Sequence, residues 1–288
     1  MARRNNPERL GAAFPDSPEL PETQQLDSLS FVVPTEFVAL PSRGLFYGEG
    51  HPLYLQESIE IKYMTAKEED LLSSKGLIEK GLVLDRLIQN LLVDNKIQSR
   101  DLLICDRNAI LIASRASGFG HEYLTNITCR RCTQTETYEY DLHDAIFTGP
   151  ISPAELAELD VEHVEDEMFK VKIPNSSTDV VIRLLNGHDE KVVLDLGDKK
   201  KKKHLEDQLV TNQLSLMIVS VMGHTESTLI TKYIESLPLR DSRFLRNIYD
   251  KISPSIELRK EFVCNECGYE DDIIFPFTVD FFWPDARI

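Results

Sequence analysis

The chain has 288 residues, of which 42% are hydrophobic, and a formal net charge of −16 at pH 7. This length and apolar content are sufficient for one or two hydrophobic cores. A negative charge of this size repels nucleic-acid phosphates, so it argues against a DNA- or RNA-binding protein. No run of about 18 apolar residues occurs, so we expect no transmembrane helix and no membrane partner.

The cysteine usage and the first residues indicate a reducing compartment. Residues 1–20 contain three arginines but lack the apolar stretch of a signal peptide. Five cysteines are too few for a disulfide scaffold in a chain of this length. We therefore expect the protein to be made and kept in a reducing cytosol, with Cys105 buried as a small hydrophobic residue.

The first region of the chain divides into an arm and a strand–turn–helix unit. Residues 1–30 are rich in proline, acidic and polar residues, which predicts an extended or disordered arm that orders on a partner. Structure is expected to begin at Phe31, with a turn at 41–44 and a strand over 58–64. Residues 31–120 therefore form the second predicted region.

Helix signals dominate the rest of that region. Thr65 and Glu68 form a capping-box pattern, which predicts a helix start. Apolar residues at helical spacing predict a helix over 83–92. Ser99 and Asp106 are expected to cap two further short helices, the second of which stops near Gly118–Gly120.

The third predicted region, residues 121–288, alternates between strand and helix patterns. Residues 153–167 are strongly acidic and predict a solvated helix or loop, and the lysine run Lys199–Lys203 predicts a solvated loop. The aromatic residues Phe281–Trp283 are expected to anchor the chain's own core, with a neighbouring subunit as the alternative. The remaining patterns predict strands over 123–128, 135–142, 168–173, 180–185, 191–196 and 256–262, and helices over 205–223, 229–237 and 241–252.

Two Cys-x-x-Cys pairs are the strongest chemical signal in the sequence. They are Cys129 with Cys132, and Cys264 with Cys267. Two intervening residues allow both sulfurs of a pair to reach one ion, and four thiolates make a closed tetrahedral Zn²⁺ site. The expected fold class is therefore α+β, a compact helical unit plus antiparallel strands with a two-knuckle, four-cysteine zinc-ribbon-like module.

The module would join strands in 121–142 to strands in 255–283, with an α/β insertion over 143–254. The separation between the pairs is far longer than the 15–20 residues of a standard zinc ribbon, so four free cysteines or redox chemistry stay as alternatives. A structural Zn²⁺ is the cofactor that the pattern favours.

No catalytic constellation is present in the sequence. The carboxylates form no recognisable acid–base frame, and the seven histidines are scattered through polar segments. Nucleophile-elbow, Walker and Rossmann glycine patterns are absent. We therefore expect no enzymatic activity and no catalytic residue.

Several segments resemble a known family. The residues that carry the resemblance are Leu40–Tyr47, the strand at 59–63, the helix start at 65–70, Asp106–Arg107 with the helix to Arg115, Gly118–Gly120 and, at the end, Asp280–Pro284. Together they resemble the baseplate hub protein family of T-even-like contractile-tailed phages, mainly over residues 31–125.

The resemblance implies a structural or assembly protein of the baseplate hub, located in the virion tail and assembled in the host cytoplasm. It implies other baseplate or tail proteins as partners, and no catalysis. A tail assembly chaperone that binds the tape measure protein and is absent from the virion is the first alternative. A zinc-ribbon regulatory or nucleic-acid-binding protein is the second, which the acidic charge disfavours.

Overall fold

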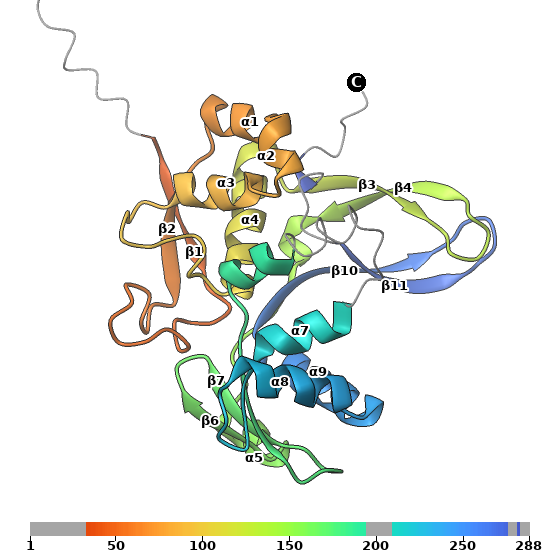
Figure 1. The fold of residues 1–288 in the computed structure, drawn as a ribbon. Helices are drawn as coiled ribbons and strands as arrows, with labels where there is room; N and C mark the ends of the chain where they lie inside the picture. The colour runs from red at the N-terminus through yellow and green to blue at the C-terminus, as the bar shows by residue number, and fades with distance from the viewer. Residues whose placement is uncertain (1–32, 194–208, 276–280, 283–288) are drawn as a thin grey trace, which may run out of the picture. The chain divides into compact units, whose positions relative to one another are not determined.

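The computed structural model describes residues 33–193, 209–275 and 281–282 (Figure 1). They form the mixture of helices and antiparallel sheets that the sequence predicts. The predicted arm over 1–30, the lysine run Lys199–Lys203 and Trp283 lie outside the described residues. Among the described helices, none combines the length and the apolar composition that a membrane crossing needs.

The fold begins with a two-stranded antiparallel sheet of β1 (Thr35–Ala39) and β2 (Ser58–Lys62). The predicted turn follows β1, with Arg43 and Gly44 at φ values of 50° and 70°. A Cβ atom on Gly44 would lie 2.4 Å from the carbonyl oxygen of Leu53. Glycine is therefore required here, both for the left-handed backbone and for the close approach.

Four helices follow: α1 (Ala66–Leu72), α2 (Lys75–Glu79), α3 (Val83–Leu91) and α4 (Ile104–Phe119). The predicted capping box starts α1: the Thr65 hydroxyl accepts from the backbone of the first turn, and Glu68 accepts from the Thr65 N–H at 3.0 Å. The apolar stripe of α3 is buried, as its spacing predicts. Helix α4 ends at the predicted glycine stop, with Gly120 at φ 85°.

Asp106 has a different place from the predicted helix cap. Helix α4 already begins at Ile104, so Asp106 lies in its first turn and is fully buried. Its carboxylate accepts hydrogen bonds from the hydroxyls of Ser42 at 2.6 Å and Tyr47 at 2.7 Å. Burial raises the pKa of Asp106 above its usual value, although these hydrogen bonds oppose the shift. The residue therefore ties the turn after β1 to α4 through tertiary contacts.

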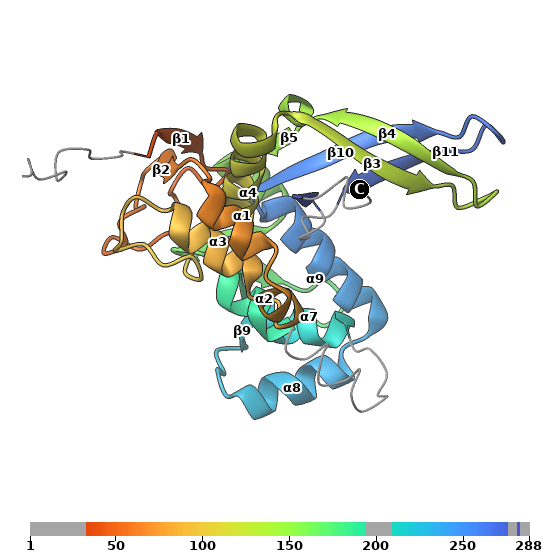
Figure 2. The same ribbon diagram turned by 90° about the horizontal axis from the view of Figure 1, so that it is seen from above.

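Two long hairpins come from distant parts of the chain. One joins β3 (Glu122–Thr128) to β4 (Thr135–Asp141), and the other joins β10 (Ser255–Val263) to β11 (Glu270–Phe275). The short helix η2 (Leu142–Asp144) leads from β4 to β5 (Ile146–Thr148), which pairs with the start of β10. Figures 1 and 2 both show the two hairpins running side by side.

Aromatic rings fill the space between the hairpins. Tyr123 of β3 lies 6.0 Å from Phe275 of β11 and 5.0 Å from Phe281 between ring centroids. Tyr140 of β4 also packs edge-on against Phe275 at 5.5 Å. Phe281 and Phe282 are fully buried, so these two residues anchor the chain's own core as predicted.

A four-stranded antiparallel sheet occupies the middle of the chain, in the order β6-β7-β8-β9. Its strands are β6 (Val161–Glu165), β7 (Met168–Lys172), β8 (Asp179–Arg183) and β9 (Ile218–Val221). The helices in this part of the chain are α5 (Pro153–Glu158), α7 (Leu209–Met217), α8 (Ser227–Ser236) and α9 (Leu239–Ile252).

Three predictions in this region need correction. The acidic segment predicted as a solvated helix or loop begins with the exposed helix α5, but its second half is strand β6, because Val161 is buried and pairs with Val171. Residues 187–193 are helical where a strand over 191–196 was predicted, since Asp189 accepts from the Asn186 N–H at 3.0 Å and caps that turn. Helix α7 stops at Met217 because the β-branched residues after it pair with β8.

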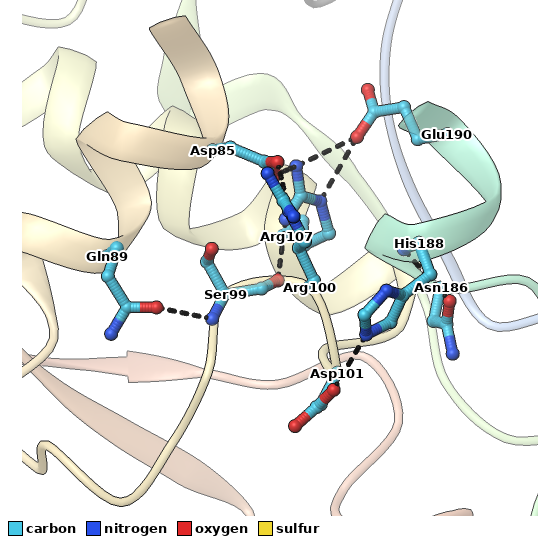
Figure 3. Close-up of polar contacts among 9 residues, drawn as sticks. All are labelled: Asp85, Gln89, Ser99, Arg100, Asp101, Arg107, Asn186, His188 and Glu190. Atoms are coloured by element: carbon cyan, nitrogen blue, oxygen red, sulfur yellow. Dashed lines mark hydrogen bonds and ion pairs between the residues drawn. The ribbon is translucent and has the colours of Figure 1, made fainter. Parts of the chain in front are cut away.

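A buried ion-pair network holds the 187–193 helix to α3 and α4 (Figure 3). Arg107 of α4 is 3% exposed and pairs with Asp85 at 2.7 Å and with Glu190 at 2.8 Å. It also donates to the carbonyl oxygen of Ser99 at 2.6 Å. A Cβ atom on Gly187 would lie 2.6 Å from the Arg107 guanidinium and 2.8 Å from the Cα atom of Arg100, and because the second contact is to backbone, glycine is favoured here.

Candidate metal centre

The structure brings the four predicted cysteine ligands together at the tips of the two hairpins. The Sγ atoms of Cys129 and Cys267 are 3.7 Å apart, and those of Cys132 and Cys264 are 3.5 Å apart. All four Sγ atoms lie within 4.8 Å of one another. The pairs thus meet although up to 138 residues separate them in sequence.

The two loops that carry the cysteines have the same backbone design. In each, the N–H of the first cysteine donates to the carbonyl five residues later: Cys129 to Gln134 at 2.8 Å and Cys264 to Tyr269 at 2.9 Å. The residue four positions after that cysteine donates back to its carbonyl, at 2.9 Å in both loops. This shared turn places both sulfurs of each pair on the same side of the loop.

The shared turn needs a left-handed residue four positions after the first cysteine. Gly268 adopts φ 63° there without steric cost, whereas Thr133 adopts φ 59° with a β-branched side chain. Such a conformation is a true outlier for threonine and costs free energy. The first loop is therefore strained where the second is relaxed.

Sulfur separations match a shared ion better than a disulfide. A tetrahedral zinc with bonds of about 2.3 Å places its sulfurs about 3.8 Å apart. The Cys132–Cys264 and Cys129–Cys267 separations, 3.5 and 3.7 Å, are close to this value and far longer than the ~2.05 Å of a sulfur–sulfur bond. All five cysteines are free, and Cys105 is buried outside the cluster. The donor set therefore fits a thiophilic metal ion.

One thiol of the cluster is acidic even without an ion. Burial raises the pKa of Cys129, but the backbone N–H groups of Cys132 and Arg131 donate toward its sulfur and bring the pKa down to about 7. Burial raises the pKa of Cys267 above its usual value. Thiolate is the form that binds metals, so these N–H groups favour the metal-binding form of the Cys129 sulfur.

Polar contacts between the hairpins surround the cysteines, and sequence reasoning did not identify them. Glu136 of β4 accepts from the backbone N–H of Asn265 at 3.0 Å and from its side-chain amide at 2.6 Å. The Cys264 thiol donates to the same carboxylate at 3.5 Å. Arg130, in the first loop, pairs with Asp271 of β11 at 3.3 Å. No local motif marks Glu136 or Asn265, because their contact spans 129 residues.

Within the part of the chain that the structure describes, no histidine or carboxylate forms another cluster of three or more metal-ligating groups.

Comparison with known proteins gives one decisive result: the family model described as T4 bacteriophage base plate protein matches residues 49–283. The chain belongs to this family.

The match extends well beyond the segments that carried the sequence resemblance. It spans α1 to α9 and both hairpins, and it includes all four cysteines of this baseplate protein. No curated protein and no solved structure matches the chain. Family membership assigns the baseplate protein to the tail of a phage virion and implies contacts with other baseplate proteins.

Proposed function

We propose that the chain is a non-enzymatic structural component of the baseplate hub, and that a structural Zn²⁺ at the four cysteines fixes its two hairpins to each other. The convergence of the four Sγ atoms within 4.8 Å carries the proposal. Membership of the baseplate family supports the structural part, and the hub assignment follows the resemblance of residues 31–125.

The chemistry of the donor set determines the kind of site. Bound there, Zn²⁺ would take four thiolate ligands and leave no open position for water, which is the pattern of a structural site. The chain's own residues contribute the two matched loops and the cross-hairpin contacts of Glu136 and Arg130. These contacts restrain the loops before any ion binds, so the site is prepared by the fold.

The mechanical consequence concerns the surface that meets neighbouring subunits. A β-hairpin alone is only marginally stable in water. The aromatic packing joins the hairpins near Tyr123 and Phe275, while the cysteines join them at the far tips. Two attachment points prevent the hairpins from swinging apart, so the pair presents one fixed surface to the next subunit.

Zinc analysis of the purified protein tests the metal. We expect one Zn²⁺ per chain after purification without added metal, and loss of it in Cys264→Ser together with a lower melting temperature and a failure to assemble. Cys105→Ala is the matched control, because Cys105 is buried outside the cluster, and it should keep its zinc. Wild-type protein without zinc would overturn the metal assignment.

The location in the particle is tested separately. We expect mass spectrometry of purified virions to detect the chain as a constituent of the tail. Its absence from the virion, together with co-purification with the tape measure protein from infected cells, would instead favour the assembly chaperone.

A further inference from the structure

A second candidate interaction site lies away from the cysteines, where α5, β6 and β7 meet the turn after β1. A pocket of about 500 Å³ opens there. Its floor is apolar and well packed: Phe46, Val161 and Phe169 are all buried, and the two phenylalanine rings lie 5.7 Å apart. The floor is therefore preformed, as is usual for sites that receive a ligand.

The walls of the pocket are mostly apolar and reach the surface, and Glu162 and His163 are the titratable residues that line it. Leu45, which lines it, is 45% exposed, and Ile151 and Leu156 are only partly buried. Ala157 of α5 also lines the pocket and is exposed. Apolar surface of this kind gains free energy when a partner's side chain displaces the water on it.

An unusual run of negative charge surrounds the pocket. From Cys132 to Phe169 the sequence contains no lysine or arginine. The carboxylates of α5, of β6 and of the turns that follow each of them are exposed, and within the described residues none of them forms an ion pair; they are Glu155, Glu158, Asp160, Glu162, Glu165 and Asp166.

Lys170 and Lys172 line a neighbouring pocket together with Asp160 and Glu162, but among the described residues no cation forms an ion pair with these carboxylates. Lys170 of β7 pairs with Asp179 of β8 at 3.2 Å. Lys251 lines an adjacent pocket together with Glu155 and Glu158 but forms no ion pair with either of them among the described residues. The like charges therefore repel one another in the isolated protein, and a cationic partner would relieve that repulsion.

We propose that this pocket docks a segment of another baseplate protein in which one or two large apolar side chains are flanked by lysine or arginine. The apolar side chain would fill the pocket above Phe46 and Phe169, and the cations would pair with Glu162 in its lining and with Glu158, which lines the neighbouring pocket. An apolar anchor in a pocket ringed by complementary charge is the arrangement that gives interfaces both affinity and fast association. The proposal does not depend on zinc.

Synthetic peptides test the chemistry of the partner. The probe is a short fluorescent peptide with two leucines between lysines, and binding to the full chain is followed by anisotropy. A version with serine in place of leucine and a version with glutamate in place of lysine are the comparison probes. We expect only the first to bind with measurable affinity, and we expect added salt to weaken it, since salt screens exposed charges.

Two matched pairs of variants localise the binding. Ala157→Arg should weaken binding about tenfold or more, because it adds a cation and fills the pocket, whereas Ala154→Arg on the same exposed helix should not. Replacing Glu158 and Glu162 by lysine should weaken binding similarly, whereas the same change at Glu79 and Glu139, which line none of these pockets, should not.

Four results would overturn the proposal. They are no binding of the lysine–leucine peptide, equal binding of the serine or glutamate peptides, equal affinity of Ala157→Arg and Ala154→Arg, and a concentration-dependent dimer that Ala157→Arg abolishes. The last result would assign the pocket to a second copy of this chain. Loss of zinc with retained peptide binding would separate this site from the metal centre.

Discussion

The ion pairs of Arg107 allow a quantitative test of how the 187–193 helix is attached. Its guanidinium is 3% exposed and contacts Asp85, Glu190 and the carbonyl oxygen of Ser99. In Asp85→Ala the buried cation loses its shortest carboxylate contact, 2.7 Å. A buried charge left without a partner costs about 3–5 kcal/mol.

The surroundings of Arg107 reduce that cost. Glu190 still contacts the guanidinium at 2.8 and 3.2 Å, but its side chain is 38% exposed, so solvent screens the remaining pair. Arg100, the other partner of Asp85, is 37% exposed and can be solvated instead. We therefore expect Asp85→Ala to lower the free energy of unfolding by about 2–3 kcal/mol.

Asp101→Ala is the matched control for this experiment. Asp101 pairs with His188 at 3.0 Å at the same helix contact, but the two side chains are 46% and 58% exposed. Exposed pairs contribute little, so this change should cost less than about 1 kcal/mol. Urea unfolding followed by circular dichroism measures both variants. Equal unfolding midpoints for the two would refute the reasoning that burial sets the energetic importance of the network.

Three further predictions follow from local geometry. Thr133→Gly should raise the free energy of unfolding by about 1 kcal/mol by relieving the left-handed backbone, and Gly268→Ala should lower it by a similar amount; thermal melts should show opposite shifts. Glu68→Gln should cost about 1 kcal/mol at neutral pH. Burial raises the pKa of Glu68, but hydrogen bonds from Thr65 and Asn90 leave the net pKa below 4.5. The carboxylate therefore stabilises the fold above pH 4.5, and the difference between wild type and Glu68→Gln should shrink as pH falls below it. A constant difference across pH would contradict this. Gly187→Ala should cost about 1–3 kcal/mol in urea unfolding, because its Cβ meets the Arg107 guanidinium and the backbone Cα atom of Arg100; an unchanged midpoint would show that both neighbours move aside without cost.

Sequence patterns predicted the features of this protein that depend on near neighbours. The capping box at Thr65 and Glu68 involves residues three positions apart, and the structure contains both of its hydrogen bonds. The Cys-x-x-Cys spacing identified the two loops because two sulfurs must reach one point. The prediction that the two pairs lie close together rested on coordination chemistry, because four thiolates are the full ligand set of one tetrahedral ion.

The predictions that failed concern residues whose role is set by distant contacts. Asp106 looks like a helix cap, but Ser42 and Tyr47, 64 and 59 residues away, bind its carboxylate inside the core. Val161 sits in an acidic stretch, yet pairing with Val171 makes it part of a strand. No periodicity within a short window contains this information, so a single sequence could not reveal it.

Because the two cysteine pairs come from distant parts of the chain, an ion bound to both would also link those parts to each other. With an ion bound, Cys132 and Cys264 would close the 132-residue span between them into a ring through sulfur and metal. A single backbone cut inside this ring would leave the two fragments joined through the ion as well as through the aromatic packing between the hairpins. An insertion into the ring would likewise lengthen a loop without separating the hairpins.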